Sequence, residues 1–271
     1  MHTSSTPVAT IFNHELLAQH RNRAANNFAA HDFLIDEMAE RLAERLDEFG
    51  RDFPVVLDIG CHSGQVAKHL TGRYGITTFI QSDISASMLA QAKGLCIRCN
   101  DETLPFAPAS FDLISSVLNL HWVNDLPGTL IQIRRALKPG GIFIASLFGG
   151  CTLTELRQVL FAEEIASNLG TSPHISPFVD SRDAAALLQR AGFAMPVIDS
   201  DILSVTYTDA ITLCRDLRGM GESNALMTKN NCYLGKQFFP SVAARYSELF
   251  PADAGRIKAS FEMITLAAMA P

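Results

Sequence analysis

The 271-residue chain contains no hydrophobic run long enough to span a membrane. Its first residues, 1–7, have neither the charged and apolar segments of a secretory signal nor the Arg-rich pattern of a mitochondrial transit peptide. Basic residues are not in excess: the net charge is −6, which gives no electrostatic support for nucleic-acid binding. We therefore expect a globular protein that binds no nucleic acid and is not stably inserted in a membrane.

Cysteine is sparse and scattered, at positions 61, 96, 99, 151, 214 and 232. Only Cys96 and Cys99 have the spacing C-x-x-C, and no second pair completes a zinc site. We interpret them as small buried thiols in or beside a strand, with a redox pair as the alternative. This cysteine usage is typical of a reducing compartment, so we expect a cytoplasmic protein.

Hydrophobic residues make up 48% of the chain and charged residues 18%, as in ordinary globular proteins. Apolar runs typical of strands alternate with segments of helical periodicity, which predicts a parallel sheet covered by helices on both faces. The predicted strands are 55–59, 77–81, 95–99, 111–117, 142–147, 197–207 and 260–269. The fold class is therefore α/β, a Rossmann-like doubly wound seven-stranded sheet with helical additions.

The pattern also suggests how the chain is organised. Residues 1–50 are expected to form a helical N-terminal segment, and residues 51–148 the ligand-binding core. Residues 149–260 are expected to form a helical lid over the substrate, together with a late strand of the sheet. Residues 261–271 are expected to close the sheet.

The segment 55–64 predicts a ligand-binding loop: an apolar run ends in Asp58, and Gly60 and Gly64 precede a helix. In a doubly wound sheet, ligands lie beyond the carboxyl ends of the strands. Glycines there allow the backbone to approach a ligand, and the helix N-terminus can bind a polar group. The spacing is neither G-x-G-x-x-G nor a P-loop, which weakens the nicotinamide and ATP interpretations.

Three further acids follow predicted strands. Asp83 is placed where an acid can accept both hydroxyls of a ribose; the alternative is a solvated cap of the next helix. Asp101 and Glu102 are placed where an acid can accept from an adenine amine, and the alternative is a charged turn.

His121 and Trp122 follow the fourth strand, where a catalytic group belongs, although both residue types are as often packing residues.

Five segments together resemble the class I S-adenosylmethionine-dependent methyltransferases, namely residues 55–64, 82–89, 100–106, 110–113 and 137–141. The resemblance implies S-adenosylmethionine as the cofactor. One departure is His62, which stands where the family usually has glycine, so its side chain must point away from the cofactor or the loop must shift. The expected cofactor-binding residues are Asp58, Gly60, His62, Gly64, Asp83, Ile84, Met88, Asp101, Glu102 and Leu118.

A narrower resemblance extends over nearly the whole chain. Residues 11–13, 121–127, 148–157, 172–178 and 217–224 resemble the complex I assembly-factor arginine hydroxylases and their bacterial relatives. This implies hydroxylation of an arginine on a complex I-type subunit, which would be the protein partner. The biotin-pathway methyltransferases, which esterify a malonyl carrier protein, are also similar. A non-catalytic assembly chaperone is the third hypothesis.

The resemblance adds His174 to His121 and Trp122 as candidate catalytic residues. Hydroxylation would need an oxidant, and two histidines with one carboxylate are the usual protein ligands for iron in such reactions. His121 and His174 are the candidates for such a pair. No histidine has a clear paired spacing with a carboxylate, so we do not assign metal ligands.

Overall fold

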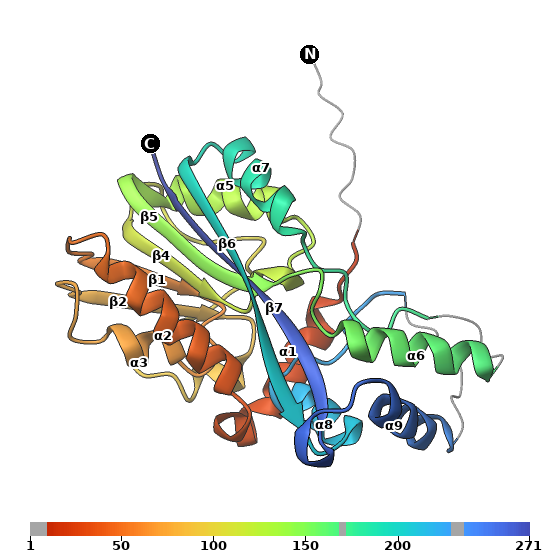
Figure 1. Cartoon of the computed structure of the whole chain (residues 1–271). Helices are drawn as coiled ribbons and strands as arrows, with labels where there is room; N and C mark the ends of the chain where they lie inside the picture. The colour runs from red at the N-terminus through yellow and green to blue at the C-terminus, as the bar shows by residue number, and fades with distance from the viewer. Residues whose placement is uncertain (1–9, 168–171, 229–235) are drawn as a thin grey trace.

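The computed structural model describes residues 10–167, 172–228 and 236–271. Its centre is a seven-stranded sheet in the order β3-β2-β1-β4-β5-β7-β6. The first five of these strands run parallel, whereas β7 is antiparallel to both β5 and β6 (Figure 1). The strands are β1 (Val55–Ile59), β2 (Thr78–Asp83), β3 (Leu95–Arg98), β4 (Phe111–Val117), β5 (Leu137–Phe148), β6 (Ala194–Tyr207) and β7 (Ile257–Met269).

Helices cover both faces of the sheet, as predicted (Figure 1). One face packs against α2 (Phe33–Asp47) and α3 (Gln65–Leu70), and the other against α5 (Leu126–Ala136) and α7 (Ser181–Arg190). Because successive side chains of a strand point to opposite faces, neighbours in β4 enter different cores. Leu113 belongs to the first core and Ile114 to the second.

The remaining helices gather where β6 and β7 extend beyond the rest of the sheet (Figure 1). Helix α8 contacts both α1 and α9, and α6 packs on α9 and β7. These helices are α1 (His14–Ala24), α6 (Thr154–Ala166), α8 (Ala210–Gly219) and α9 (Phe238–Leu249). Shorter helical turns are α4 (Ala86–Leu89), η1 (Ala25–Ala30), η2 (Leu120–Trp122) and η3 (Asp253–Gly255). Within the described ranges, no helix is both long and apolar enough to cross a lipid bilayer.

Two local expectations are wrong. The fifth strand was expected over 142–147, but β5 begins at Leu137 and so includes the run 138–141. Gly140 donates from its backbone to the Ala270 carbonyl at 2.8 Å, and a register shift between β4 and β5 accommodates the turn-forming residues. The Cys96 thiol is exposed because β3 is the edge strand of the sheet; Cys232 lies outside the described residues.

Candidate active site

The loop after β1 folds tightly at the carboxyl edge of the sheet. Gly60, His62 and Gly64 have positive φ angles of 67°, 51° and 99°. The Cys61 N–H donates to the Ser82 carbonyl at 2.9 Å, which ties the loop to the end of β2. Gly64 then precedes α3, so the glycine-rich loop lies where the sequence predicts a ligand-binding loop.

Gly60 is required because another side chain lies directly over it. A Cβ built at Gly60 would lie 1.9 Å from Cγ of Asn119, which follows β4. The Asn119 amide donates to Oδ2 of Asp101 at 2.9 Å, and both side chains are buried. Burial raises the pKa of Asp101 to about 6. Asp101 lies in a turn, as the alternative held, but its side chain is buried beside the glycine-rich loop.

His62 is held by its own packing. Its Nε2 donates to the Val117 carbonyl at 3.1 Å, and its ring stacks on Phe28 of η1 at a centroid distance of 5.6 Å. Burial lowers the pKa of His62 to about 4, so the ring is neutral at pH 7. The histidine side chain therefore packs between the end of β4 and the N-terminal segment.

Asp83, at the end of β2, accepts hydrogen bonds from three different groups of the site. Its Oδ2 accepts from Nη1 of Arg21 and from the His62 N–H, each at 3.1 Å, and its Oδ1 accepts from the Ser85 N–H at 2.7 Å. Asp83 is completely buried, and Ser85 caps α4 with its own side chain, which accepts from the Met88 N–H. The alternative of a solvated helix cap is therefore wrong for Asp83.

The other acids of the predicted site have different surroundings. Asp58 accepts from the Ser115 hydroxyl at 2.8 Å, and burial raises the pKa of Asp58 to about 8. Glu102 accepts from the backbone N–H groups of Asn124 and Asp125, so its carboxylate holds the start of the next helix. A direct cofactor contact by Glu102 stays a prediction.

The three apolar residues expected at the cofactor lie close to the same edge. Met88 and Leu118 are buried in the first core, and Leu118 has a positive φ angle of 45°. Ile84 is partly exposed, and its carbonyl accepts from Arg98 Nε at 3.0 Å. Their contacts with a cofactor also stay predictions.

Buried polar atoms around the loop fit S-adenosylmethionine. Within the described chain, Nε and Nη2 of Arg21, Oδ1 of Asp101 and Oδ1 of Asn119 have no hydrogen-bond partner. Donors and acceptors left unpaired in one place suit a ligand that supplies both kinds of group. The carboxylate of the cofactor would suit the guanidinium of Arg21, and its adenine amine would suit Asp101. A ribose contact by Asp83 stays a prediction, because both oxygens of Asp83 already accept from protein groups. The methyl sulfonium of the cofactor would supply the group-transfer chemistry.

A second set of side chains meets beyond β4 and β5. Glu222, in the loop after α8, accepts from His121 Nε2 at 2.9 Å and from Trp122 Nε1 at 3.0 Å. Burial raises the pKa of Glu222, but the charges of His121 and Arg21 and the hydrogen bonds from His121 and Trp122 together outweigh it, so the pKa of Glu222 is lowered overall. Glu222 is therefore ionised at neutral pH.

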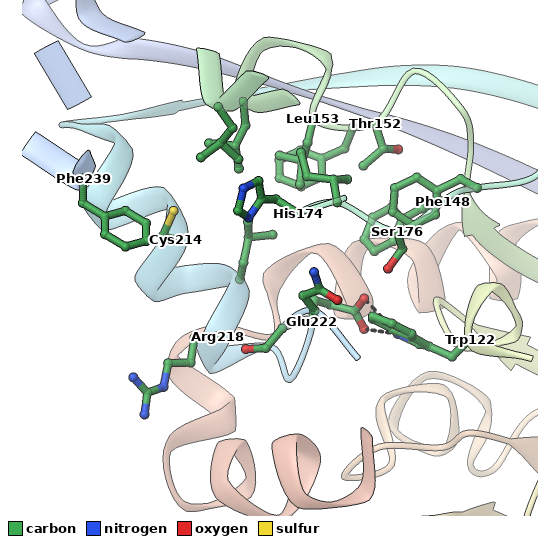
Figure 2. Close-up of a pocket in the computed structure, with 18 residues that line it drawn as sticks. Trp122, Phe148, Thr152, Leu153, His174, Ser176, Cys214, Arg218, Glu222 and Phe239 are labelled. Carbon is green, nitrogen blue, oxygen red and sulfur yellow. Dashed lines mark hydrogen bonds between the residues drawn. The ribbon is translucent and has the colours of Figure 1, made fainter. Parts of the chain in front are cut away.

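A pocket of about 290 Å³ opens over Glu222 and Trp122 (Figure 2). Its walls are mostly apolar. They include the rings of Phe148 of β5 and Phe178, which pack edge to face with their centroids 5.9 Å apart. His174 lies on another wall, where its Nε2 donates to Glu164 at 2.7 Å. The structure thus brings the candidate catalytic residues Trp122 and His174 to one pocket. His121 does not line this pocket but contacts Glu222, which does.

The two candidate histidines do not share a carboxylate: His121 pairs with Glu222 and His174 with Glu164. Among the described residues, no group of three or more His, Cys, Asp or Glu side chains is arranged to hold a metal ion.

Sequence reasoning missed three residues of the site. Neither Arg21 nor Asn119 was singled out, and Glu222 was named only as part of the segment 217–224, which carries the family resemblance. Each depends on a contact between distant segments, such as the 101 residues that separate His121 from Glu222. Of these three residues, only Asn119 had a local signal in the sequence that pointed to the site: it is a polar residue just after a predicted strand.

Comparison with known proteins identifies the fold's family. Residues 57–145 match the family described as Methyltransferase domain. The mouse (Mus musculus) mitochondrial arginine-hydroxylase NDUFAF5 is 39% identical over 267 residues, which cover 96% of this chain and 78% of the relative. The chain belongs to the class I S-adenosylmethionine-dependent methyltransferases. It is an enzyme of this superfamily, and S-adenosylmethionine is its cofactor.

Members of the superfamily that are named for another activity are similar to this chain to a comparable degree. The malonyl-[acyl-carrier protein] O-methyltransferase of Xylella fastidiosa is 38% identical over 259 residues, covering 92% of this chain and 85% of the relative. Among solved structures, the YcgJ protein of Bacillus subtilis aligns with a TM-score of 0.58 at 15% identity, covering 84% and 97% of the two chains. The latter similarity confirms the methyltransferase fold alone.

Proposed function

We propose that this protein hydroxylates an arginine side chain of a complex I-type subunit during assembly of that complex. The observation that carries the proposal is the ionised Glu222 at the inner end of an apolar pocket. A buried carboxylate attracts a cationic side chain and repels an anionic one. The similarity to proteins named arginine hydroxylases, over 96% of this chain, gives independent support.

The pocket lies next to the cofactor loop. A Cβ built at Gly221 would lie 3.2 Å from Cγ of Arg21, whose guanidinium reaches Asp83 in the loop site. The charge of Arg21 also contributes to the lowered pKa of Glu222. A substrate side chain in the pocket would therefore be held beside the cofactor, in a fixed position that favours reaction.

The reaction needs more than the cofactor. A carbon–hydrogen bond of the substrate is replaced by a carbon–oxygen bond, and the carbon loses two electrons. We take dioxygen as the oxidant: one oxygen atom enters the product, and the other leaves as water with two electrons from a reductant and two protons. The role of this chain's residues is to bind and orient the arginine and to exclude water.

The second candidate function is methyl esterification of a malonyl carrier protein. The similarity to the Xylella fastidiosa methyltransferase favours it. In that reaction a carboxylate oxygen of the malonyl group takes the methyl group from the sulfonium of the cofactor. The malonyl carboxylate would have to lie near Glu222, which is why we favour the arginine substrate.

Mass spectrometry after co-expression with the candidate subunit tests the proposal. We expect one arginine-containing peptide to gain the mass of an oxygen atom, and the gain to be absent when this chain is omitted. A gain of one methylene mass, or methyl transfer to a malonyl carrier protein supplied with labelled cofactor, would instead establish the second function.

We also infer a reducing, cytoplasmic compartment. The cysteines in the described ranges are all free thiols, at positions 61, 96, 99, 151 and 214. Free thiols, two of them exposed, are typical of proteins that stay in a reducing environment.

A further inference from the structure

We propose that Glu222 binds the guanidinium group of the substrate, with His121 and Trp122 as positioning residues that orient its carboxylate. The inference rests on the proposed function and names the residue that would recognise the arginine. It also revises the expectation that His121 and Trp122 are themselves catalytic.

The neighbours of Glu222 fix its orientation. Trp122 Nε1 donates to both carboxylate oxygens, at 3.1 and 3.0 Å, and His121 Nε2 donates to one of them at 2.9 Å. The His121 side chain is completely buried, so this contact is shielded from water. A carboxylate offers about four acceptor positions, so both oxygens keep capacity for a planar, two-pronged donor such as a guanidinium.

The pocket walls match the rest of an arginine side chain. Apolar residues that line the pocket are Phe148, Leu153, Leu156, Phe178 and Phe261. They would contact the methylene groups of the substrate while the charged end meets Glu222. Burying a charge without a partner is costly, so a guanidinium that reaches this depth needs the carboxylate.

Arg218 and His174 also line the pocket, but neither creates a binding site for an anion beside Glu222. Arg218 is exposed, and Figure 2 shows its guanidinium pointing away from Glu222 and Trp122. His174 is engaged by Glu164 at 2.7 Å. His121 and Arg21, whose positive charges lower the pKa of Glu222, do not line the pocket. The charged group that a side chain in the pocket meets beside Trp122 is therefore the Glu222 carboxylate, which favours a cationic side chain.

Binding of small probes tests the inference without requiring turnover. The probes are N-acetyl-arginine methylamide and its citrulline counterpart, which has nearly the same shape but no charge. Trp122 is the only tryptophan of the chain and lines the pocket, so its fluorescence reports occupancy, and calorimetry gives the affinity. We expect the arginine probe to bind about tenfold more tightly or better, because hydrogen bonds between charged groups are stronger than neutral ones.

Variants then assign this preference to Glu222. Glu222→Gln is expected to bind both probes with equal affinity, whereas Glu248→Gln, an exposed control on α9, is expected to keep the full preference. Trp122→Phe and His121→Gln, read by calorimetry, are expected to weaken arginine binding several-fold and leave citrulline binding unchanged. A merely structural role would weaken both probes alike.

Three results would overturn the inference: equal binding of arginine and citrulline by the natural protein, an unchanged preference in Glu222→Gln, or displacement of the arginine probe by malonyl-pantetheine. The first and third need no variant, so they decide the matter even if Glu222→Gln fails to fold. Hydroxylation seen in the co-expression experiment alongside any of these results would reject the Glu222 assignment alone. Glu222-dependent probe binding, together with no oxygen mass gain on the subunit in the co-expression experiment, would reject the hydroxylase proposal alone.

Discussion

Arg21 and Asp83 form an ion pair with 3.1 Å between Nη1 and Oδ2, and neither side chain is exposed to solvent. The pair joins helix α1 to the end of β2, across 62 residues of sequence. It places a guanidinium with two unpaired nitrogens next to the glycine-rich loop. The N-terminal helix therefore contributes a buried guanidinium beside the glycine-rich loop.

Asp83→Asn is expected to lower the free energy of unfolding by about 3–5 kcal/mol, because it leaves the Arg21 guanidinium buried without its counter-ion. Urea denaturation measures the change. Asp47→Asn is the control, since its partner Arg73 lies on the surface and solvent replaces the lost contact. The double variant Arg21→Met, Asp83→Asn should recover part of the loss; fully additive effects would contradict the pairing.

Gly60→Ala is expected to weaken S-adenosylmethionine binding by about tenfold or more, because the new methyl group displaces Asn119 from its contact with Asp101. Isothermal titration calorimetry measures the affinity. Gly72→Ala is the matched control: its φ angle is +81°, so it suffers the same backbone strain, but nothing lies within 4 Å of the added carbon. Equal losses in the two variants would show that strain, and not the Asn119 contact, accounts for the effect.

His62→Gly restores the residue that the family usually has. We expect stability to fall by about 2–4 kcal/mol, because the loss of a buried ring that stacks on Phe28 outweighs relief of the positive φ angle. Cofactor affinity should change only a few-fold, since the His62 ring packs against the protein. Ala254→Gly, at an exposed residue with a φ angle of 57°, relieves similar strain without removing a ring and should not destabilise. A His62→Gly variant more stable than the natural protein would disprove this account.

Asp58 should make stability fall as the pH rises from its ordinary pKa of 3.8 to its folded pKa of about 8. Its pKa is about 8 in the folded protein against 3.8 ordinarily, so in this range the folded state binds a proton that the unfolded state has released. Stability then falls as pH rises toward about 8. His62, with its pKa lowered from 6.5 to about 4, acts in the opposite direction only below about pH 6.5.

Between about pH 6.5 and 8, the natural protein is therefore expected to lose about 2 kcal/mol of stability, and Asp58→Asn to show no such decline. Denaturation curves across this window measure the slope. Asp47→Asn should keep the natural slope, because the pKa of Asp47 is lowered and its titration lies at acidic pH. A slope that persists in Asp58→Asn would assign the effect to another group.

Much of the fold was predictable because its signals are local. The alternation of apolar strands and amphipathic helices predicted the sheet, and β1 and β4 begin and end at the predicted residues. The N-terminal segment was expected to be helical, but the bounds of α1 and the burial of Arg21 were not predicted, because Arg21 is buried by contacts with distant segments. The length of β5 was also missed, because the backbone contact of Gly140 with Ala270 comes from the far end of the chain.

By itself, the sequence determined the chain's α/β fold, the glycine-rich loop and the positions of Asp58, Asp83 and Asp101 after their strands. Strand periodicity and turn chemistry depend on neighbouring residues, so they can be read in order along the chain. Only the tertiary structure decided that Arg21 reaches Asp83 and that Glu222 meets His121 and Trp122. Burial turns those distant contacts into the strong electrostatic interactions of the site, and burial is a property of the packed chain as a whole.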